Sequence, residues 1–122
     1  MTPIAAIASA AALVALASTT TREPNTLTAE ERADGWTLLF DGATTEHFRA
    51  YRADAFPAQG WAVIDGTLRR VPGEWGGDIV TREQYADFEF ICEWLVTPGG
   101  NSGVIYRCTE DRGASWETGL EM

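Results

Sequence analysis

Four polar side chains late in the chain have types and a spacing that suit the binding of a sugar and acid–base chemistry on it. Glu93 lies in an apolar stretch, and Arg107 follows the loop "PGGNS" (98–102). The loop itself contributes the amide of Asn101 and the hydroxyl of Ser102. Polar groups that converge on one sheet face beside aromatic rings are typical of a carbohydrate site. The alternative is an exposed cross-strand ion pair between Glu93 and Arg107, worth ~0–1 kcal/mol, and periodicity alone favours that interpretation.

Two strands joined by this loop must position these groups, and we expect them near residues 88–96 and 103–109. A loop centred on residue 100 pairs residues whose numbers sum to 200, so that Glu93 faces Arg107 and Cys92 faces Cys108. Opposed residues in a hairpin have Cβ atoms about 4.5–5.5 Å apart, which makes a disulfide reachable in an oxidising compartment. A pair of small buried thiols is the alternative, and both interpretations stay open because a one-residue change of register removes the match.

Local signals predict a short helix and a tight hairpin earlier in the chain. Thr28-x-x-Glu31 is a capping box and predicts one or two helical turns. Asp65-Gly66 is a two-residue hairpin turn within "GWAVIDGTLRRV". This turn pairs Ile64 with Thr67 and Val63 with Leu68.

The remaining segments favour an all-β sandwich in one domain. We expect further short strands over residues 36–40, 77–81 and 116–122. Short strands separated by Gly and Pro are typical of sandwiches, and 122 residues suffice for one domain.

The first 17 residues resemble a secretory signal peptide. They are apolar over a stretch shorter than the ~20 residues of a spanning helix, and Ala15-Leu16-Ala17 forms an A-x-A cleavage pattern. No Lys or Arg precedes the apolar stretch, so an uncleaved anchor or a misassigned start is the alternative. We predict an exported protein, periplasmic or extracellular, without stable membrane insertion after cleavage. A linker follows at 18–27 and the domain at 28–122.

The charge balance excludes some partners. Nine basic residues stand against eighteen acidic ones, which gives a net charge of −9. Such a chain repels phosphate backbones, so nucleic acid and anionic membrane surfaces are poor partners. Neutral sugars, cations and basic partners stay open.

Several blocks resemble the DUF1080 family, the 3-keto-disaccharide hydrolase domain. They are "LTAEERADGWTLLFDGATTEHF", "GWAVIDGTL", "GGDIVTREQYADFEFICEWLVTPGGNSGVIYR" and "WETGLEM". The resemblance implies a concanavalin A-like jelly-roll sandwich. In longer members, the strand that matches "WETGLEM" continues into a "Q-[IV]-L-D" segment and a His-containing stretch. We therefore expect an N-terminal part of the domain, an incomplete sandwich with an exposed strand edge near 116–122.

The resemblance also implies a chemistry, the cleavage of 3-keto-glycosides by removal of the C2 proton, elimination and hydration. Such a reaction needs a base near C2, a donor or cation at the C3 oxygen and an acid at the leaving oxygen. By position, Glu121 or Glu93 would be the base, and Arg107 and Asn101 would bind the oxyanion or hydroxyls, with Ser102 beside them. A non-catalytic carbohydrate-binding module and a structural domain are the alternatives.

The resemblance predicts no cofactor and leaves a divalent metal open. His47, the only histidine, lies in the segment "TTEHFRAY" and is assigned no metal. The sequence departs from the family at Ile91 and Leu95, two apolar residues at positions where basic residues are usual. Further departures are Cys92, Cys108 and Phe48.

Overall fold

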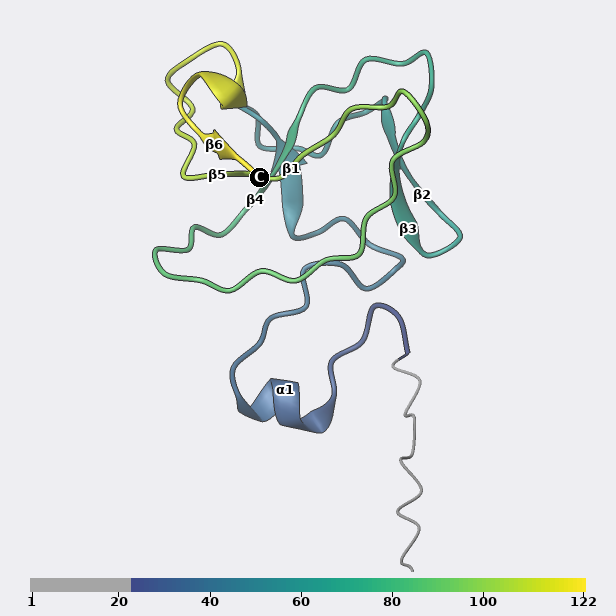
Figure 1. Ribbon diagram of the computed structural model, residues 1–122, viewed down its shortest axis with the longest axis vertical. Coiled ribbons are helices and arrows are strands. Elements are labelled where there is room, and N and C mark those ends of the chain that lie inside the picture. The colour runs from purple at the N-terminus through teal and green to yellow at the C-terminus, as the bar shows by residue number, and fades with distance from the viewer. Residues whose placement is uncertain (1–22) are drawn as a thin grey trace, which may run out of the picture.

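The computed structural model describes residues 23–122, and Figure 1 shows the order of its elements. The predicted signal peptide, residues 1–17, lies outside the described residues. Of the expected linker, residues 23–27 are described, and Asn25 Nδ2 donates to the Gly66 carbonyl at 2.9 Å. This contact ties the start of the described chain to a hairpin turn more than forty positions later.

The predicted capping box is confirmed at the start of α1 (Ala29–Ala33). The hydroxyl of Thr28 accepts from the Glu31 N–H at 3.1 Å, and the Glu31 carboxylate accepts from the Thr28 N–H at 2.8 Å. These two bonds satisfy backbone donors that have no partner inside the helix. The helix buries none of its residues, so its cap contributes more to its formation than packing does.

The predicted Asp65-Gly66 hairpin is also confirmed. β2 (Trp61–Ile64) pairs antiparallel with β3 (Thr67–Arg70) in the expected register. Asp65 has φ 49° and Gly66 has φ 69°, the left-handed pair that a type I′ turn requires. Gly, which has no Cβ, and Asp tolerate this conformation better than most residue types, which is why the sequence predicts the turn.

A second sheet joins distant segments. β1 (Phe48–Ala50) pairs antiparallel with β4 (Ile79–Thr81), with Arg49 opposite Val80. β4 lies within the strand expected over 77–81, whereas β1 was not expected. The strand expected over 36–40 is not formed, and its larger side chains are half-buried in irregular chain.

The third sheet carries the end of the sequence. β5 (Ile105–Tyr106) pairs antiparallel with β6 (Leu120–Glu121), and the pairing extends through two bonds between Val104 and Met122 at 2.9 and 3.4 Å. The intervening loop contains the 3₁₀ turn η1 (Ser115–Glu117). The expected strand over 116–122 is therefore present in its second half.

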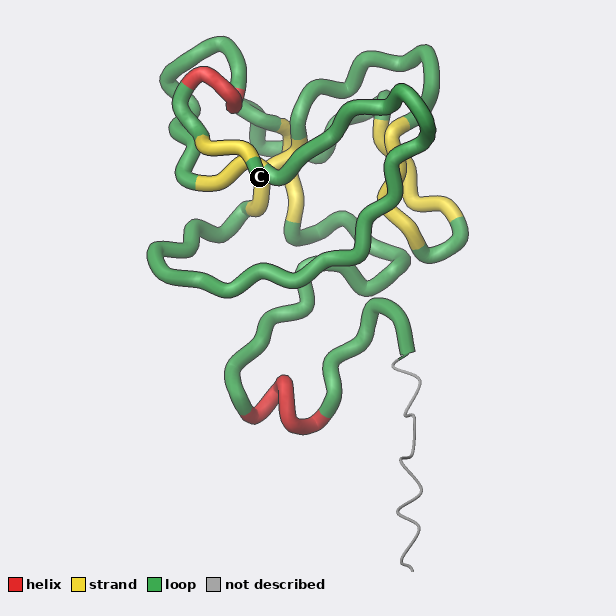
Figure 2. Tube along the Cα trace, in the orientation of Figure 1, coloured by secondary structure: helices red, strands yellow, loops and turns green. Residues whose placement is uncertain are grey.

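The predicted hairpin between residues 88–96 and 103–109 is wrong in this structure. Residues 88–104 form no strand, and Figure 2 draws them as a long loop. Arg107 adopts a left-handed backbone, φ 56°, which ends β5 before Cys108 can enter a ladder. Cys92 and Cys108 are both free thiols, Cys92 exposed and Cys108 half-buried. The structure therefore shows neither of the two arrangements left open by the sequence, a disulfide or a pair of buried thiols.

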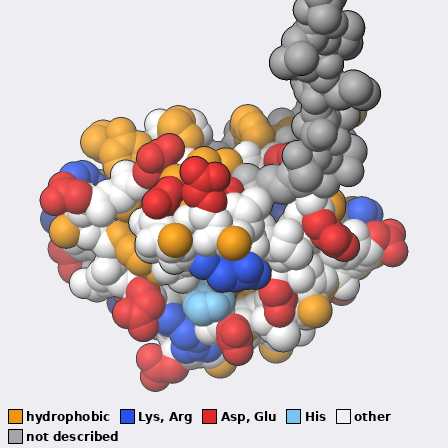
Figure 3. All heavy atoms as spheres, turned by 90° about the horizontal axis from the view of Figure 1, so that it is seen from below, with side chains coloured by type: hydrophobic (Ala, Val, Ile, Leu, Met, Phe, Trp, Pro, Cys, Tyr) orange, Lys and Arg blue, Asp and Glu red, His pale blue; other side chains and the backbone are white. Residues whose placement is uncertain are grey.

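The architecture of residues 23–122 is all-β, as predicted, with three two-stranded antiparallel sheets that match an incomplete jelly roll. Its core is small, since Gly60, Ala114 and Ser115 are the only buried residues of the described range 23–122. Large apolar side chains are exposed instead, among them Leu95 at 94%. Figure 3 shows acidic side chains spread over one face, with apolar side chains surfacing between them. Within residues 23–122 no helix has the length and apolarity to cross a bilayer.

Candidate functional site

Glu121 lies beside the loop that carries two of the predicted site residues. β6 places its side chain against Gly103, and a Cβ at residue 103 would clash with the Glu121 carboxylate. Gly103 has no positive φ, so space rather than backbone conformation calls for glycine there. The absence of a side chain at residue 103 leaves room for the carboxylate at the loop.

Asn101 and Ser102 precede Gly103 directly and are both exposed. Neither side chain makes a hydrogen bond to another group within residues 23–122. The turn before them is held by a bond from Gly100 N–H to the Thr97 carbonyl at 2.8 Å. Their amide and hydroxyl are free to meet a ligand near Glu121.

Glu93 comes from a segment that lines a hollow next to the same strand ends. The hollow measures about 420 Å³ and is lined by Phe90, Ile91, Cys92, Trp94, Val104 and Met122. Glu93 itself is exposed and is not among the lining residues. The walls of this hollow are apolar, and Ile91, one of the departures from the family pattern, is part of that apolar wall.

Arg107 does not face Glu93. Its guanidinium donates to the Ala86 carbonyl at 3.4 Å, and no ion pair between it and Glu93 forms within the described chain. The structure therefore holds Glu121 against Gly103, directly after Asn101 and Ser102. Arg107 follows the end of β5, with its guanidinium at the Ala86 carbonyl. The expected Glu93–Arg107 pairing fails, as the disulfide does, in a structure where residues 88–104 form no strand.

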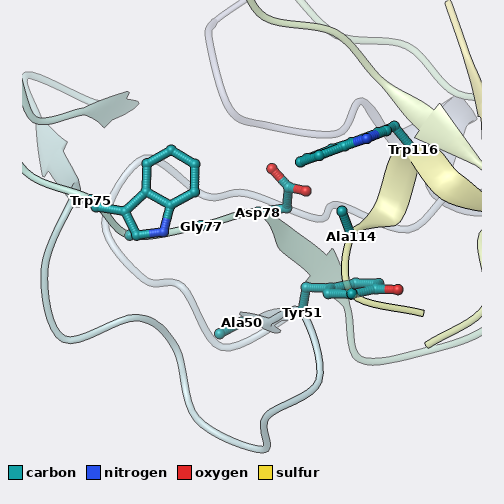
Figure 4. Close-up of a pocket in the computed structure, with 9 residues that line it drawn as sticks. Ala50, Tyr51, Trp75, Gly77, Asp78, Ala114 and Trp116 are labelled. Atoms are coloured by element: carbon teal, nitrogen blue, oxygen red, sulfur yellow. The ribbon is translucent and has the colours of Figure 1, made fainter. Parts of the chain in front are cut away.

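Sequence reasoning missed a second hollow, of about 200 Å³, built around Asp78. Its walls include Tyr51, Trp75, Ala114 and Trp116, and Figure 4 shows the Asp78 carboxylate between the Trp75 and Trp116 side chains. One Asp78 oxygen accepts from the Ser115 hydroxyl at 2.5 Å. The run Trp75-Gly-Gly-Asp78 was the available signal, since glycines next to an aromatic residue and a carboxylate mark a loop that can approach a ligand closely.

An ion pair holds the loop after β5 against β1. The Arg49 guanidinium donates two bonds to Glu110, at 2.7 Å each, and the Arg52 N–H donates a third at 2.5 Å. The Arg49 hydrogen bonds, with that of the Arg52 N–H, lower the pKa of Glu110 to about 2. The same contact raises the pKa of Arg49. Both groups are therefore charged at neutral pH, and Arg49 directly precedes Ala50 and Tyr51, which line the Asp78 hollow.

The described residues do not present a metal-binding donor set. No group of three or more His, Cys, Asp or Glu side chains in residues 23–122 is arranged to hold an ion. His47 has its Nε2 3.7 Å from a Glu46 carboxylate oxygen.

The chain is similar in sequence to one protein family and to a named bacterial relative. The model of a family described as the 3-keto-alpha-glucoside-1,2-lyase-like domain matches residues 35–122. A 3-keto-disaccharide hydrolase from Bacteroides thetaiotaomicron is 35% identical over 86 residues, an alignment that covers 64% of this chain and 29% of the relative. The chain thus spans less than a third of the length of that relative.

Proposed function

Because the chain belongs to the 3-keto-alpha-glucoside-1,2-lyase-like domain family, we propose that the whole protein cleaves the glycosidic bond of 3-keto-glycosides. The relative from Bacteroides thetaiotaomicron is named for a 3-keto-disaccharide, which supports a small carbohydrate as the substrate. The net charge of −9 favours an uncharged sugar over a phosphorylated one.

The proposed reaction uses the acidity that a C3 ketone gives to the neighbouring C2–H bond. A base takes the C2 proton, and the electron pair of that bond forms an enolate with the C3 oxygen. The enolate then forms a C1–C2 double bond and expels the glycosidic oxygen, which takes up a proton. Water adds across the double bond, with its hydroxyl on C1 and its proton on C2, so that the net result is hydrolysis. General acid–base groups and donors at the enolate oxygen are what this sequence of steps needs.

One observation carries the assignment of the base. The β5–β6 pairing holds the exposed Glu121 carboxylate against Gly103, directly after Asn101 and Ser102. No hydrogen bond or ion pair within the described chain occupies this carboxylate, so it is available to accept a proton. Asn101 and Ser102 would bind sugar hydroxyls or the enolate oxygen beside it.

Glu93 is the alternative base in this proposal, and Arg107 is a candidate for binding the enolate oxygen. Glu93 is the rival base, because its segment lines the hollow at the ends of β5 and β6. Arg107 would stabilise negative charge on the C3 oxygen, and its single weak bond to a backbone carbonyl leaves most of its donors free.

A carbohydrate-binding module without catalysis is the second candidate. It is favoured by the apolar wall that Ile91 contributes next to Glu93, since an apolar wall binds a sugar face but transfers no proton. Incubation of the full-length protein with a 3-keto-disaccharide distinguishes the two. Release of the free monosaccharides supports the enzyme, and saturable binding without release supports the module. If the protein neither binds the 3-keto-disaccharide nor releases monosaccharides from it, both candidates are contradicted.

We also propose export, from the apolar stretch and the Ala15-Leu16-Ala17 pattern. N-terminal sequencing of the protein recovered from the cell envelope or medium is expected to begin at Ser18. A mature protein that starts at Met1 in the cytoplasm would contradict this proposal.

A further inference from the structure

We propose that the hollow around Asp78 is a separate carbohydrate subsite that binds one pyranose ring of the substrate away from Glu121. The inference rests on the proposed sugar substrate. The hollow shares no lining residue with the larger one beside β5 and β6. Its volume of about 200 Å³ falls below the ~300–1,000 Å³ of sites that enclose drug-sized ligands. It therefore suits a single ring and not a whole disaccharide.

Trp75 forms one wall of the hollow, and it is exposed although contacts hold its loop in place. Its side chain is 77% exposed, and its carbonyl accepts from Gln59 Nε2 at 3.2 Å. The guanidinium of Arg70 lies 5.9 Å from the centre of its ring, within the range of a cation–π contact. Gly76 packs so closely on the backbone of Gln59 that a side chain there would clash. These contacts hold the loop, which lowers the entropy that a ligand must remove on binding.

Hydrogen bonds also hold Tyr51 and Asp78, two further residues that line the hollow. The Tyr51 N–H donates to the Asp78 carbonyl at 3.0 Å, and the Tyr51 hydroxyl lies 2.8 Å from the Thr109 carbonyl. The Asp78 carboxylate is oriented by Ser115, which is only 2% exposed. Its other oxygen, Oδ1, accepts no hydrogen bond from residues 23–122. Asp78 thus offers one oriented acceptor toward the opening.

This combination of groups fits a neutral sugar. Trp116 is 62% exposed, and Figure 4 shows its ring beside the Asp78 carboxylate, with Trp75 across the opening. The C–H face of a pyranose packs on an aromatic ring, and its hydroxyls donate to a carboxylate oxygen. An alkylammonium ion is the other ligand that an aromatic wall and a carboxylate attract, so the test must separate the two.

The test measures binding of an unoxidised glycoside, methyl α-D-glucopyranoside, to the full-length protein by calorimetry or ligand-observed NMR. This probe has no C3 ketone and cannot undergo the proposed reaction, so the result does not depend on turnover. We expect Trp116→Ala and Trp75→Ala each to weaken binding about three- to tenfold. Tyr85→Ala is the matched control, because Tyr85 is 42% exposed and lines neither hollow, and it is expected to bind like the wild type.

The outcomes separate this inference from the proposed function. Weakened binding in both Trp variants supports the subsite even if the protein turns over no 3-keto-disaccharide. Unchanged binding in both variants overturns the subsite even if turnover is high. Tetramethylammonium that binds more tightly than the glycoside and competes with it also overturns the sugar assignment. Circular dichroism of each variant shows whether a loss of binding reflects a loss of fold, and Asp78→Ala then supplies a second, non-aromatic test with the same expected loss.

Discussion

Arg49 in β1 and Glu110 after β5 form a two-pronged ion pair, with both guanidinium–carboxylate distances at 2.7 Å. The two side chains are 20% and 32% exposed, so water reaches the pair but does not surround it. Sixty-one positions separate them in the sequence. Together with the Arg52 N–H, the pair fastens the 107–113 loop to the β1–β4 sheet, whose strands are flanked by Tyr51 and Asp78.

This pair predicts an acid-sensitive step in stability. The pKa of Glu110 is lowered from 4.5 to about 2, so its contribution to stability is complete above about pH 4.5 and is lost as the pH falls through about 2. Because the carboxylate is partly exposed, we expect a contribution on the order of 1–2 kcal/mol. Urea unfolding between pH 7 and pH 2 measures it.

Glu110→Gln is expected to lower the free energy of unfolding at pH 7 by that amount and to flatten its fall below pH 4.5. Glu83→Gln is the control, because only the backbone carbonyl of Glu83 is engaged. Equal pH profiles for wild type and Glu110→Gln would contradict the role of the pair.

Glu121→Gln in the full-length protein is expected to lower turnover of a 3-keto-glycoside by ~10²–10⁴-fold, the usual contribution of a general base. Binding of the same sugar should persist, because the amide keeps the size and shape of the side chain. Glu93→Gln should stay within about tenfold of wild type, ~1.4 kcal/mol. Steady-state kinetics with parallel calorimetry measures both, and the reverse pattern would exchange the two roles.

Gly103→Ala is expected to lower turnover through Glu121, because the new Cβ occupies the space of its carboxylate. The loss should be smaller than that of Glu121→Gln, since a flexible side chain can shift aside. The control is a double-mutant cycle. If Gly103 acts through Glu121, Gly103→Ala has no further effect on turnover in the Glu121→Gln protein, whereas additive losses would show an independent effect on the loop.

The two thiols are expected to be alkylated in the native protein without prior reduction, since both are free. Cys92 should react faster than Cys108, because it is exposed while Cys108 is half-buried. Mass spectrometry after a timed iodoacetamide pulse gives both rates. If neither thiol reacts until dithiothreitol is added, the cross-strand disulfide expected from the sequence register exists in solution.

The sequence by itself determined the features whose causes are local. The Thr28–Glu31 cap and the Asp65-Gly66 turn each join residues at most three positions apart, so side-chain type and spacing specify them completely. The all-β class follows in the same way from the density of turn signals.

Only the tertiary structure decided which strands pair and where the candidate sites lie. β5 pairs with β6 and not with residues 88–96, which form no strand, and the left-handed Arg107 ends β5. The Asp78 hollow depends on a bond to Ser115 across 37 positions, and the Arg49–Glu110 pair spans 61. Contacts at such separations depend on the free energy of closing long loops across the whole chain. A short window of residues does not contain that information.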